Sequence, residues 1–182
     1  MKKIIGVFFI LILTISCNQK KSIQEIQIDT KHTIEVPTGL VKTTDLNPQA
    51  VIQLKDANKE LYLIVVKEPI EEIDNFFKEN KQTLGNQFTQ DFKGYADLTY
   101  LSLLQKAKVK TPAILRATEI NGLTTYTVKF DALVSGLDVY YNFAAVKGEE
   151  YYYQILVWTL NTKKEQNKDE MERMVSSFKV VK

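Results

Sequence analysis

Residues 113–160 read AILRATEINGLTTYTVKFDALVSGLDVYYNFAAVKGEEYYYQILVWTL, and this stretch decides the fold. It predicts four consecutive antiparallel strands at residues 114–120, 123–133, 137–146 and 151–160. The connections between them are Asn121-Gly122, Ser135-Gly136 and residues 147–149. Asn-Gly is a strong hairpin signal because a type I′ turn needs positive φ at both of its central residues.

The positions of the apolar residues in these strands predict how the sheet is covered. The first half of the strand at 123–133 is one-sided, because apolar residues alternate there with Thr and Lys. The strand at 151–160 is two-sided, with Ile155 and Val157 on one face and Leu156 and Trp158 on the other. A strand that is apolar on both faces must be covered on both, so we place it in the middle of three layers.

The rest of the chain predicts further strands and three helices. Apolar spacing indicates a pair of short strands within residues 23–37, closed by Pro37-Thr38-Gly39, and strands at 51–54 and 61–66. Helices are expected from Pro69 to a stop at Gly85-Asn86, at 91–105, and after a capping box formed by Thr162 and Glu165. The predicted fold class is α+β: a predominantly antiparallel sheet with helices on both faces, in one domain spanning residues 23–182.

The N-terminus has the parts of a signal peptide. Lys2 and Lys3 precede an apolar run at residues 4–13, and small residues follow before Cys17. The apolar run is about half of the ~20 residues that a helix needs to cross a bilayer. Residues 1–16 are therefore predicted to be a signal peptide.

Thr14-Ile15-Ser16-Cys17 resembles the lipobox of bacterial lipoproteins, in which cleavage falls just before an acylated cysteine. Thr14 replaces the usual Leu, and the Thr-x-Ser ending also suits the ordinary signal peptidase. The resemblance implies a diacylglycerol and an N-acyl chain, such as palmitate, on Cys17, with no other cofactor. It further implies a tether at residues 17–22 and export to the periplasm-facing membrane leaflet of a Gram-negative cell envelope.

Charge and cysteine content narrow the function classes. The chain has 24 Lys and Arg against 22 Asp and Glu, and loss of Lys2 and Lys3 leaves 22 of each. A neutral domain argues against nucleic acid as a partner, because nucleic-acid-binding domains normally carry a clearly basic face. Cys17 is the only cysteine, so the domain has no disulfide framework and depends on its core.

Sequence motifs for catalysis are scarce. His32 is the only histidine in the chain, so it is the only candidate for the base of a catalytic triad. One histidine also cannot form a zinc site of ordinary ligation by itself. We therefore predict no catalytic and no metal-binding residue, and we expect His32 to be an exposed turn residue. Carboxylates cluster at three places: Glu68, Glu71, Glu72 and Asp74; Glu149 and Glu150; Asp169, Glu170 and Glu172. Helix-dipole complementarity, a polar hairpin end and a solvated helix face explain these clusters.

Aromatic residues gather on the last two predicted strands: Tyr140, Tyr141, Phe143, Tyr151, Tyr152, Tyr153 and Trp158. Most of them are interpreted as sheet core, where tyrosine hydroxyls reach the edge. The alternative is a contact site for a protein, lipid or glycan. The residues expected to contribute to it are Tyr140, Tyr152, Tyr153 and Trp158, with Tyr140, Tyr152 and Trp158 on one face.

The element order, together with Val36-Pro37-Thr38-Gly39 and Val175-Ser176-Ser177-Phe178, resembles the PsbP-like (DcrB-like) α/β/α sandwich family. That family is best known for binding and assembly rather than for a shared chemistry. The resemblance implies a non-enzymatic envelope lipoprotein that binds other envelope proteins or helps to assemble them. Two alternatives stay open: a small-ligand or lipid/glycan carrier with a pocket between sheet and helices, and an envelope hydrolase that uses paired carboxylates.

The lipid anchor leads to a direct test. Cells that express the chain and are fed a labelled fatty acid should incorporate the label into the wild type but not into Cys17→Ser, because acylation needs the thiol. Gel fluorography of the immunoprecipitated protein measures it. Label in both variants contradicts lipidation at Cys17.

Overall fold

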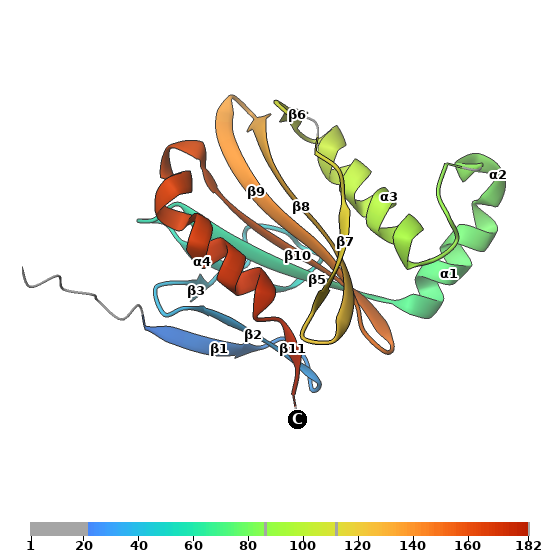
Figure 1. Cartoon of the computed structure of the whole chain (residues 1–182), viewed down its shortest axis with the longest axis horizontal. Helices are drawn as coiled ribbons and strands as arrows, with labels where there is room; N and C mark the ends of the chain where they lie inside the picture. Colours follow the sequence, from blue (N-terminus) through green and yellow to red (C-terminus); the bar gives the residue numbers. More distant parts are fainter. Residues whose placement is uncertain (1–21, 86, 112, 182) are drawn as a thin grey trace, which may run out of the picture.

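Two antiparallel sheets and four α-helices make up the part of the chain that the computed structural model describes, residues 22–85, 87–111 and 113–181 (Figure 1). The predicted signal peptide, Cys17 and most of the tether lie outside these ranges, as does Asn86. No helix within them is long and apolar enough to cross a membrane.

The large sheet has eight strands in the order β3-β4-β5-β10-β9-β8-β6, with β7 paired to β8 beside β6. Its strands are β3 (Val41–Lys42), β4 (Ala50–Asp56), β5 (Leu61–Pro69), β6 (Lys108–Val109), β7 (Arg116–Ile120), β8 (Leu123–Val134), β9 (Leu137–Lys147) and β10 (Tyr151–Leu160). The last four are the four strands predicted from residues 113–160. Both two-residue turns have positive φ at each central residue, 48° and 83° at Asn121 and Gly122, and 50° and 84° at Ser135 and Gly136.

Strand β10 lies in the middle of this sheet, hydrogen-bonded to β5 on one edge and to β9 on the other. Ile155 and Val157 are fully buried in the core on one face, whereas Tyr152 is buried in the core on the other. The two-sided pattern of its sequence therefore predicted its central position correctly.

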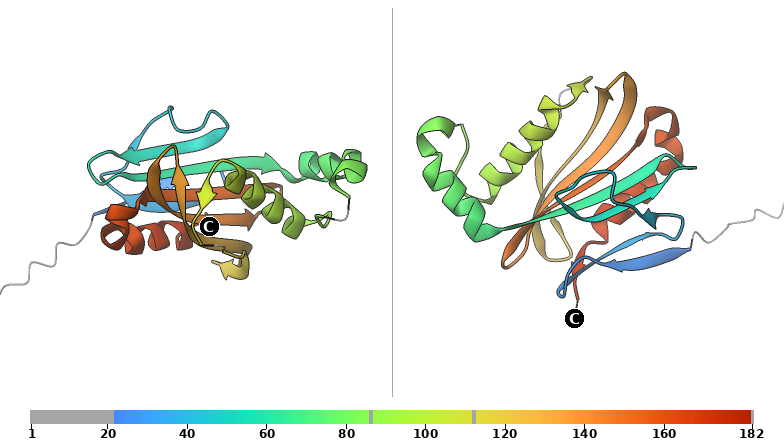
Figure 2. Two further views of the ribbon diagram at one scale, coloured as in Figure 1. Left: turned by 90° about the horizontal axis from the view of Figure 1, so that it is seen from above. Right: turned by 180° about the vertical axis from the view of Figure 1, so that it is seen from behind.

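One face of the large sheet is covered by α4 (Lys164–Ser176) and by a separate three-stranded sheet (Figure 2). The small sheet consists of β1 (Ile23–Gln27), β2 (His32–Pro37) and β11 (Lys179–Val180), in the order β1-β2-β11. Ile34 of β2, Met171 of α4 and Phe178 are fully buried in the shared core. The predicted N-terminal strand pair is confirmed, and β11 joins it from the far end of the chain.

The opposite face carries the helical insert, α1 (Ile70–Glu79), α2 (Lys81–Leu84) and α3 (Phe92–Gln105). Phe77 of α1, Tyr95 of α3 and Phe143 of the sheet are buried in the same core. Figure 2 shows that α1 and α2 continue past the end of β5, so this layer covers the sheet incompletely. The predicted three-layer α+β arrangement is confirmed.

Three helix boundaries differ from their predictions. Pro69 is the last residue of β5 and the N-cap of α1, rather than a first-turn residue, and the helix expected up to Gly85 is divided into α1 and α2. The capping box at Thr162 is wrong, because Asn161–Lys163 form a 3₁₀ turn and no side chain caps α4. The start of α3 agrees, with the Asp91 carboxylate accepting from the Gly94 N–H.

Gly94 leads to a stability prediction. A Cβ at this position would lie 1.7 Å from the carbonyl oxygen of Thr89, which is backbone and cannot rotate away. Gly94→Ala should therefore lower the free energy of unfolding by about 2 kcal/mol, although Ala ordinarily stabilises a helix by about 1 kcal/mol relative to Gly. Urea unfolding followed by circular dichroism measures it. The control Gln105→Ala, on the exposed last turn of the same helix, should change little, and a stabilised Gly94→Ala contradicts the close approach.

Candidate functional site

A groove of about 330 Å³ lies between the helical layer and the large sheet. One wall is a single face of α3, because its lining residues recur at helical spacing: Tyr95, Leu98, Thr99, Ser102, Leu103 and Lys106. From Tyr95 to Lys106 the wall is about 16 Å long at a rise of ~1.5 Å per residue.

The other walls come from β5, β9, β10, α1 and the loop before β4. Alternate residues of β5, Ile64, Val66 and Glu68, face the groove because side chains alternate across a strand. Gln154 and Leu156 continue this floor on β10. Phe143 of β9 completes the floor of the groove, and Ile73 and Phe76 line it from α1. Asn47 and Gln49, from the loop before β4, also line the groove.

Glu68 is the acidic group of the groove. Its Oε2 accepts a hydrogen bond from the Tyr95 hydroxyl at 2.6 Å and another from the Gln154 amide at 2.6 Å. Burial, reinforced by the charge of Glu68, raises the pKa of Tyr95 well above its usual range, so the phenol stays a donor. Within the described part of the chain, no Lys, Arg or His forms an ion pair with Glu68. The arrangement can therefore receive a cation or another hydrogen-bond donor.

The rest of the α3 wall is less polar than its sequence suggests. The Thr99 hydroxyl donates to the Tyr95 carbonyl at 2.9 Å, and the Ser102 hydroxyl donates to the Leu98 carbonyl at 2.8 Å. Both hydroxyls are thus satisfied by their own helix. The groove therefore combines a mainly apolar surface with one carboxylate held at one end.

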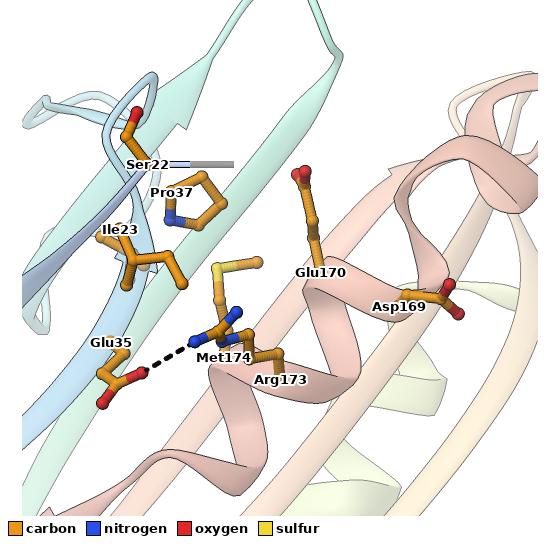
Figure 3. Close-up of a pocket in the computed structure, with 9 residues that line it drawn as sticks. Ser22, Ile23, Glu35, Pro37, Asp169, Glu170, Arg173 and Met174 are labelled. Carbon is orange, nitrogen blue, oxygen red and sulfur yellow. Dashed lines mark ion pairs between the residues drawn. The ribbon is translucent and has the colours of Figure 1, made fainter. Parts of the chain in front are cut away.

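A second, smaller pocket of about 140 Å³ lies between the small sheet and α4. Ile23, Pro37 and Met174 line it, and Figure 3 shows Glu35 and Arg173 joined between β2 and α4. That ion pair measures 3.5 Å. The pocket has less than half the volume of the groove and has room for little more than one side chain.

The structure overturns the expectation for His32. The residue is 4% exposed, and its ring stacks on Phe178 with the centroids 5.3 Å apart. Its Nδ1 lies 3.1 Å from Oδ1 of Asp29 and 3.0 Å from the Tyr153 hydroxyl. The turn was located correctly, but Tyr153 covers it from 121 residues away, a contact that no local pattern contains.

Asp29 is the centre of this cluster. Its Oδ2 accepts from Lys67 at 2.8 Å and from the Tyr153 hydroxyl at 2.7 Å. Burial alone would raise the pKa of Asp29, but the hydrogen bonds from Lys67, Tyr153, the Lys31 backbone and His32 outweigh it and hold the pKa well below its usual range. The cluster joins the small sheet to β5 and β10, which gives it a structural role.

The aromatic residues singled out from the sequence divide between the two cores. Tyr140 and Tyr153 pack on the α4 side, and Tyr152 on the helical-insert side, all of them buried. The expectation that Tyr140 shares a face with Tyr152 and Trp158 is wrong, because the register pairs Tyr140 with Thr159 rather than with Trp158. Trp158 is half-buried and stacks on Tyr62 at 5.3 Å. A partner contact through these side chains stays a prediction.

The carboxylate clusters lie only partly where their predicted roles place them, because Glu68 belongs to β5 and faces the groove, and Glu170 is 6% exposed and pairs with Lys59 instead of lying on a solvated helix face. Glu71 and Glu72 occupy the first turn of α1. Glu149 and Glu150 pair with Lys31 at the end of the last hairpin, and Glu172 of α4 pairs with Lys129. Among the described residues, no three His, Cys, Asp or Glu side chains are grouped closely enough to hold a metal ion.

Solved structures of other proteins share this fold. No protein-family model matches the chain, and no curated protein matches it. The PsbP protein CyanoP of Synechocystis sp. PCC 6803 superimposes with a TM-score of 0.54 at 16% identity, over 91% of this chain and 98% of that one. LpqN of Mycobacterium tuberculosis, described as involved in cell envelope biogenesis, gives 0.53 at 10% identity, over 88% and 92%. The likeness shows a PsbP-like fold.

The sequence predicted α3 and, as one alternative, a pocket between the sheet and the helices, but it did not identify the residues that line the groove. The one signal was the breadth of the apolar stripe, in which Tyr100, Leu103 and Leu104 extend the face begun by Tyr95 and Leu98. Tyr100 packs on Phe143 and Phe130, whereas Leu98 and Leu103 line the groove. A broad stripe thus marked a helix that contacts the sheet along one side and faces a groove along the other.

Asp29 leads to a pH-dependent prediction. Because its pKa is depressed in the folded state, its stabilising contribution is present above about pH 4, the pKa of an unfolded Asp, and is lost as the pH falls further. The stability lost through Asp29→Asn should therefore shrink at acidic pH. Urea unfolding from about pH 6 to about pH 2.5 measures it. The control Asp169→Asn, on the exposed surface of α4, should follow the wild type, and a pH-independent loss for Asp29→Asn contradicts the assignment.

Proposed function

We propose that this chain is a non-enzymatic binding module of the cell envelope, which binds other envelope proteins or helps to assemble them. In this proposal the lipid on Cys17 holds the module at the periplasm-facing membrane leaflet of a Gram-negative bacterium. The observation that carries it is the groove beside α3. It is already formed, it is mainly apolar, and it holds one oriented carboxylate on Glu68.

Two observations support a location in the cell envelope, one from the sequence and one from a protein of the same fold. The N-terminal lysines, apolar run and Cys17 resemble the leader of an exported lipoprotein. A protein of the same fold, LpqN, is described as involved in cell envelope biogenesis. A shared fold hosts many functions, so this likeness supports the proposal by analogy.

The chemistry of the groove supports binding over catalysis. General acid–base catalysis needs titratable groups within hydrogen-bond reach of one reacting centre. Glu68 is at one end of the α3 wall, and Lys106, the other charged residue of the groove, is about 16 Å along it. Among the described residues that line the groove, no second carboxylate opposes Glu68, which disfavours the hydrolase alternative.

A small-ligand or lipid/glycan carrier is the second candidate, and the volume of the groove favours it. Pockets for small molecules usually measure about 300–1,000 Å³ and have apolar walls with a few oriented polar groups. The groove, at about 330 Å³, lies at the lower end of that range. It is also located where the carrier alternative requires, between the sheet and the helical layer.

Photo-crosslinking in membranes separates the candidates. A photoreactive amino acid replaces Phe76, which is 40% exposed at the groove, or, as the control, exposed Thr118 on β7. Protein adducts at Phe76 and not at Thr118 are expected, because only the first position lies on the groove. Electrophoresis and mass spectrometry of the purified adducts measure it.

A groove variant and three other possible results make the crosslinking experiment able to contradict the proposal. Leu98→Glu puts a charge on the apolar wall and should remove the Phe76 adducts while the far-ultraviolet spectrum stays that of the wild type. Adducts of small-molecule mass at Phe76 favour the carrier. Equal adducts at both positions, or none at either, contradict a binding function for the groove.

A further inference from the structure

The groove has a charge at each end. Glu68 is held at the Tyr95 end of α3, and Lys106 follows the last residue of the helix at the other end. Lys106 is exposed and, like Glu68, forms no ion pair with another described residue. Two unlike charges therefore lie at opposite ends of a groove whose α3 wall is about 16 Å long, and neither has a counter-ion among the described residues.

Apolar side chains occupy the interval between these charges. Leu98 and Leu103 form the α3 side, while Val66 and Leu156 form the sheet side. Burying aliphatic groups here removes apolar surface from water on both partners, which is the main source of binding free energy. A ligand that matches the groove is therefore apolar in the middle and charged at its ends.

The length of the groove, as distinct from its volume, favours a segment of polypeptide over a compact small molecule. A length of about 16 Å corresponds to about five residue steps of an extended chain at ~3.3 Å each, and because its side chains alternate between two faces, two charged residues that both face the groove are an even number of steps apart, about six. The rim carries the amides of Asn47 and Gln49, groups that can hydrogen-bond to a peptide backbone. Phe76 is 40% exposed at the same groove, as is common for apolar residues at protein contacts.

We infer that the groove binds an extended segment of a partner protein that has a basic residue at one end, an acidic residue about six positions away and, on the same face between them, aliphatic residues at every second position. The basic residue pairs with Glu68, and the acidic residue pairs with Lys106. This inference rests on the proposed function and names the chemistry of the partner. It also fixes the orientation of the segment along α3.

Three labelled peptides with blocked ends test the inference: KTLTLTE, QTLTLTQ and KTLTLTK, in which both end residues and both leucines share one face of an extended chain. They are titrated by fluorescence anisotropy against the lipidated chain in nanodiscs. KTLTLTE should bind about three- to tenfold more tightly than QTLTLTQ, because it forms two charge-assisted contacts. KTLTLTK should be weaker than KTLTLTE, because its second lysine meets Lys106.

Lys106→Glu supplies the decisive variant. It should reverse the preference, so that KTLTLTK binds more tightly than KTLTLTE, a result that a merely structural role of Lys106 would not produce. Glu68→Gln keeps an acceptor for Tyr95 and should reduce the advantage of KTLTLTE over QTLTLTQ. The matched control is Lys93→Glu, the same charge change on an α3 residue outside the groove, which should leave the wild-type order unchanged.

Three outcomes overturn the inference: no saturable binding of any peptide, equal binding of all three, or a reversal produced by Lys93→Glu as well. The crosslinking at Phe76 keeps this separate from the proposed function. Protein adducts at Phe76 without charge-dependent peptide binding leave the binding module standing and exclude this partner chemistry. Absence of both contradicts the two proposals together.

Discussion

Strand β10 is hydrogen-bonded along both edges and packed on both faces, and the two hydrophobic cores of the protein meet at it. A strand in this position needs apolar residues at nearly every place, which residues 151–160 supply. Its pairing with β5 joins the N-terminal half of the chain to the C-terminal meander. The small sheet, α4 and the helical insert therefore all depend on β10 for a surface to cover.

The two faces of the sheet are closed to different extents, and this difference creates the candidate site. On one face, buried apolar residues hold α4 and the small sheet against the large sheet. The cluster of Asp29, His32, Tyr153 and Lys67 adds polar contacts between the two sheets. On the other face, α1 and α2 continue past the end of β5, and α3 covers the sheet with only part of its circumference (Figure 1). The uncovered strip between α3 and β5 is the groove.

The features that could be predicted from the sequence are those determined by residues close together along the chain. Asn121-Gly122 and Ser135-Gly136 fix their hairpins by positive φ, so the meander was predictable to within a few residues. Asp91 likewise starts α3 by capping it within three residues. Local reasoning failed for the capping box at Thr162, where a 3₁₀ turn occurs instead, and for Tyr140, whose face depends on the register between β9 and β10.

By itself, the sequence determined the α+β class, the order of the elements and the central place of β10, because turn chemistry and apolar periodicity act over short stretches of chain. Tertiary structure alone decided the burial of His32 and the composition of the groove. Glu68 meets Tyr95 from 27 residues away and Gln154 from 86 residues away, so three elements must fold together before the carboxylate is oriented. Contacts between residues so far apart in the sequence depend on how the layers pack, and they cannot be predicted from the periodicity of a single strand or helix.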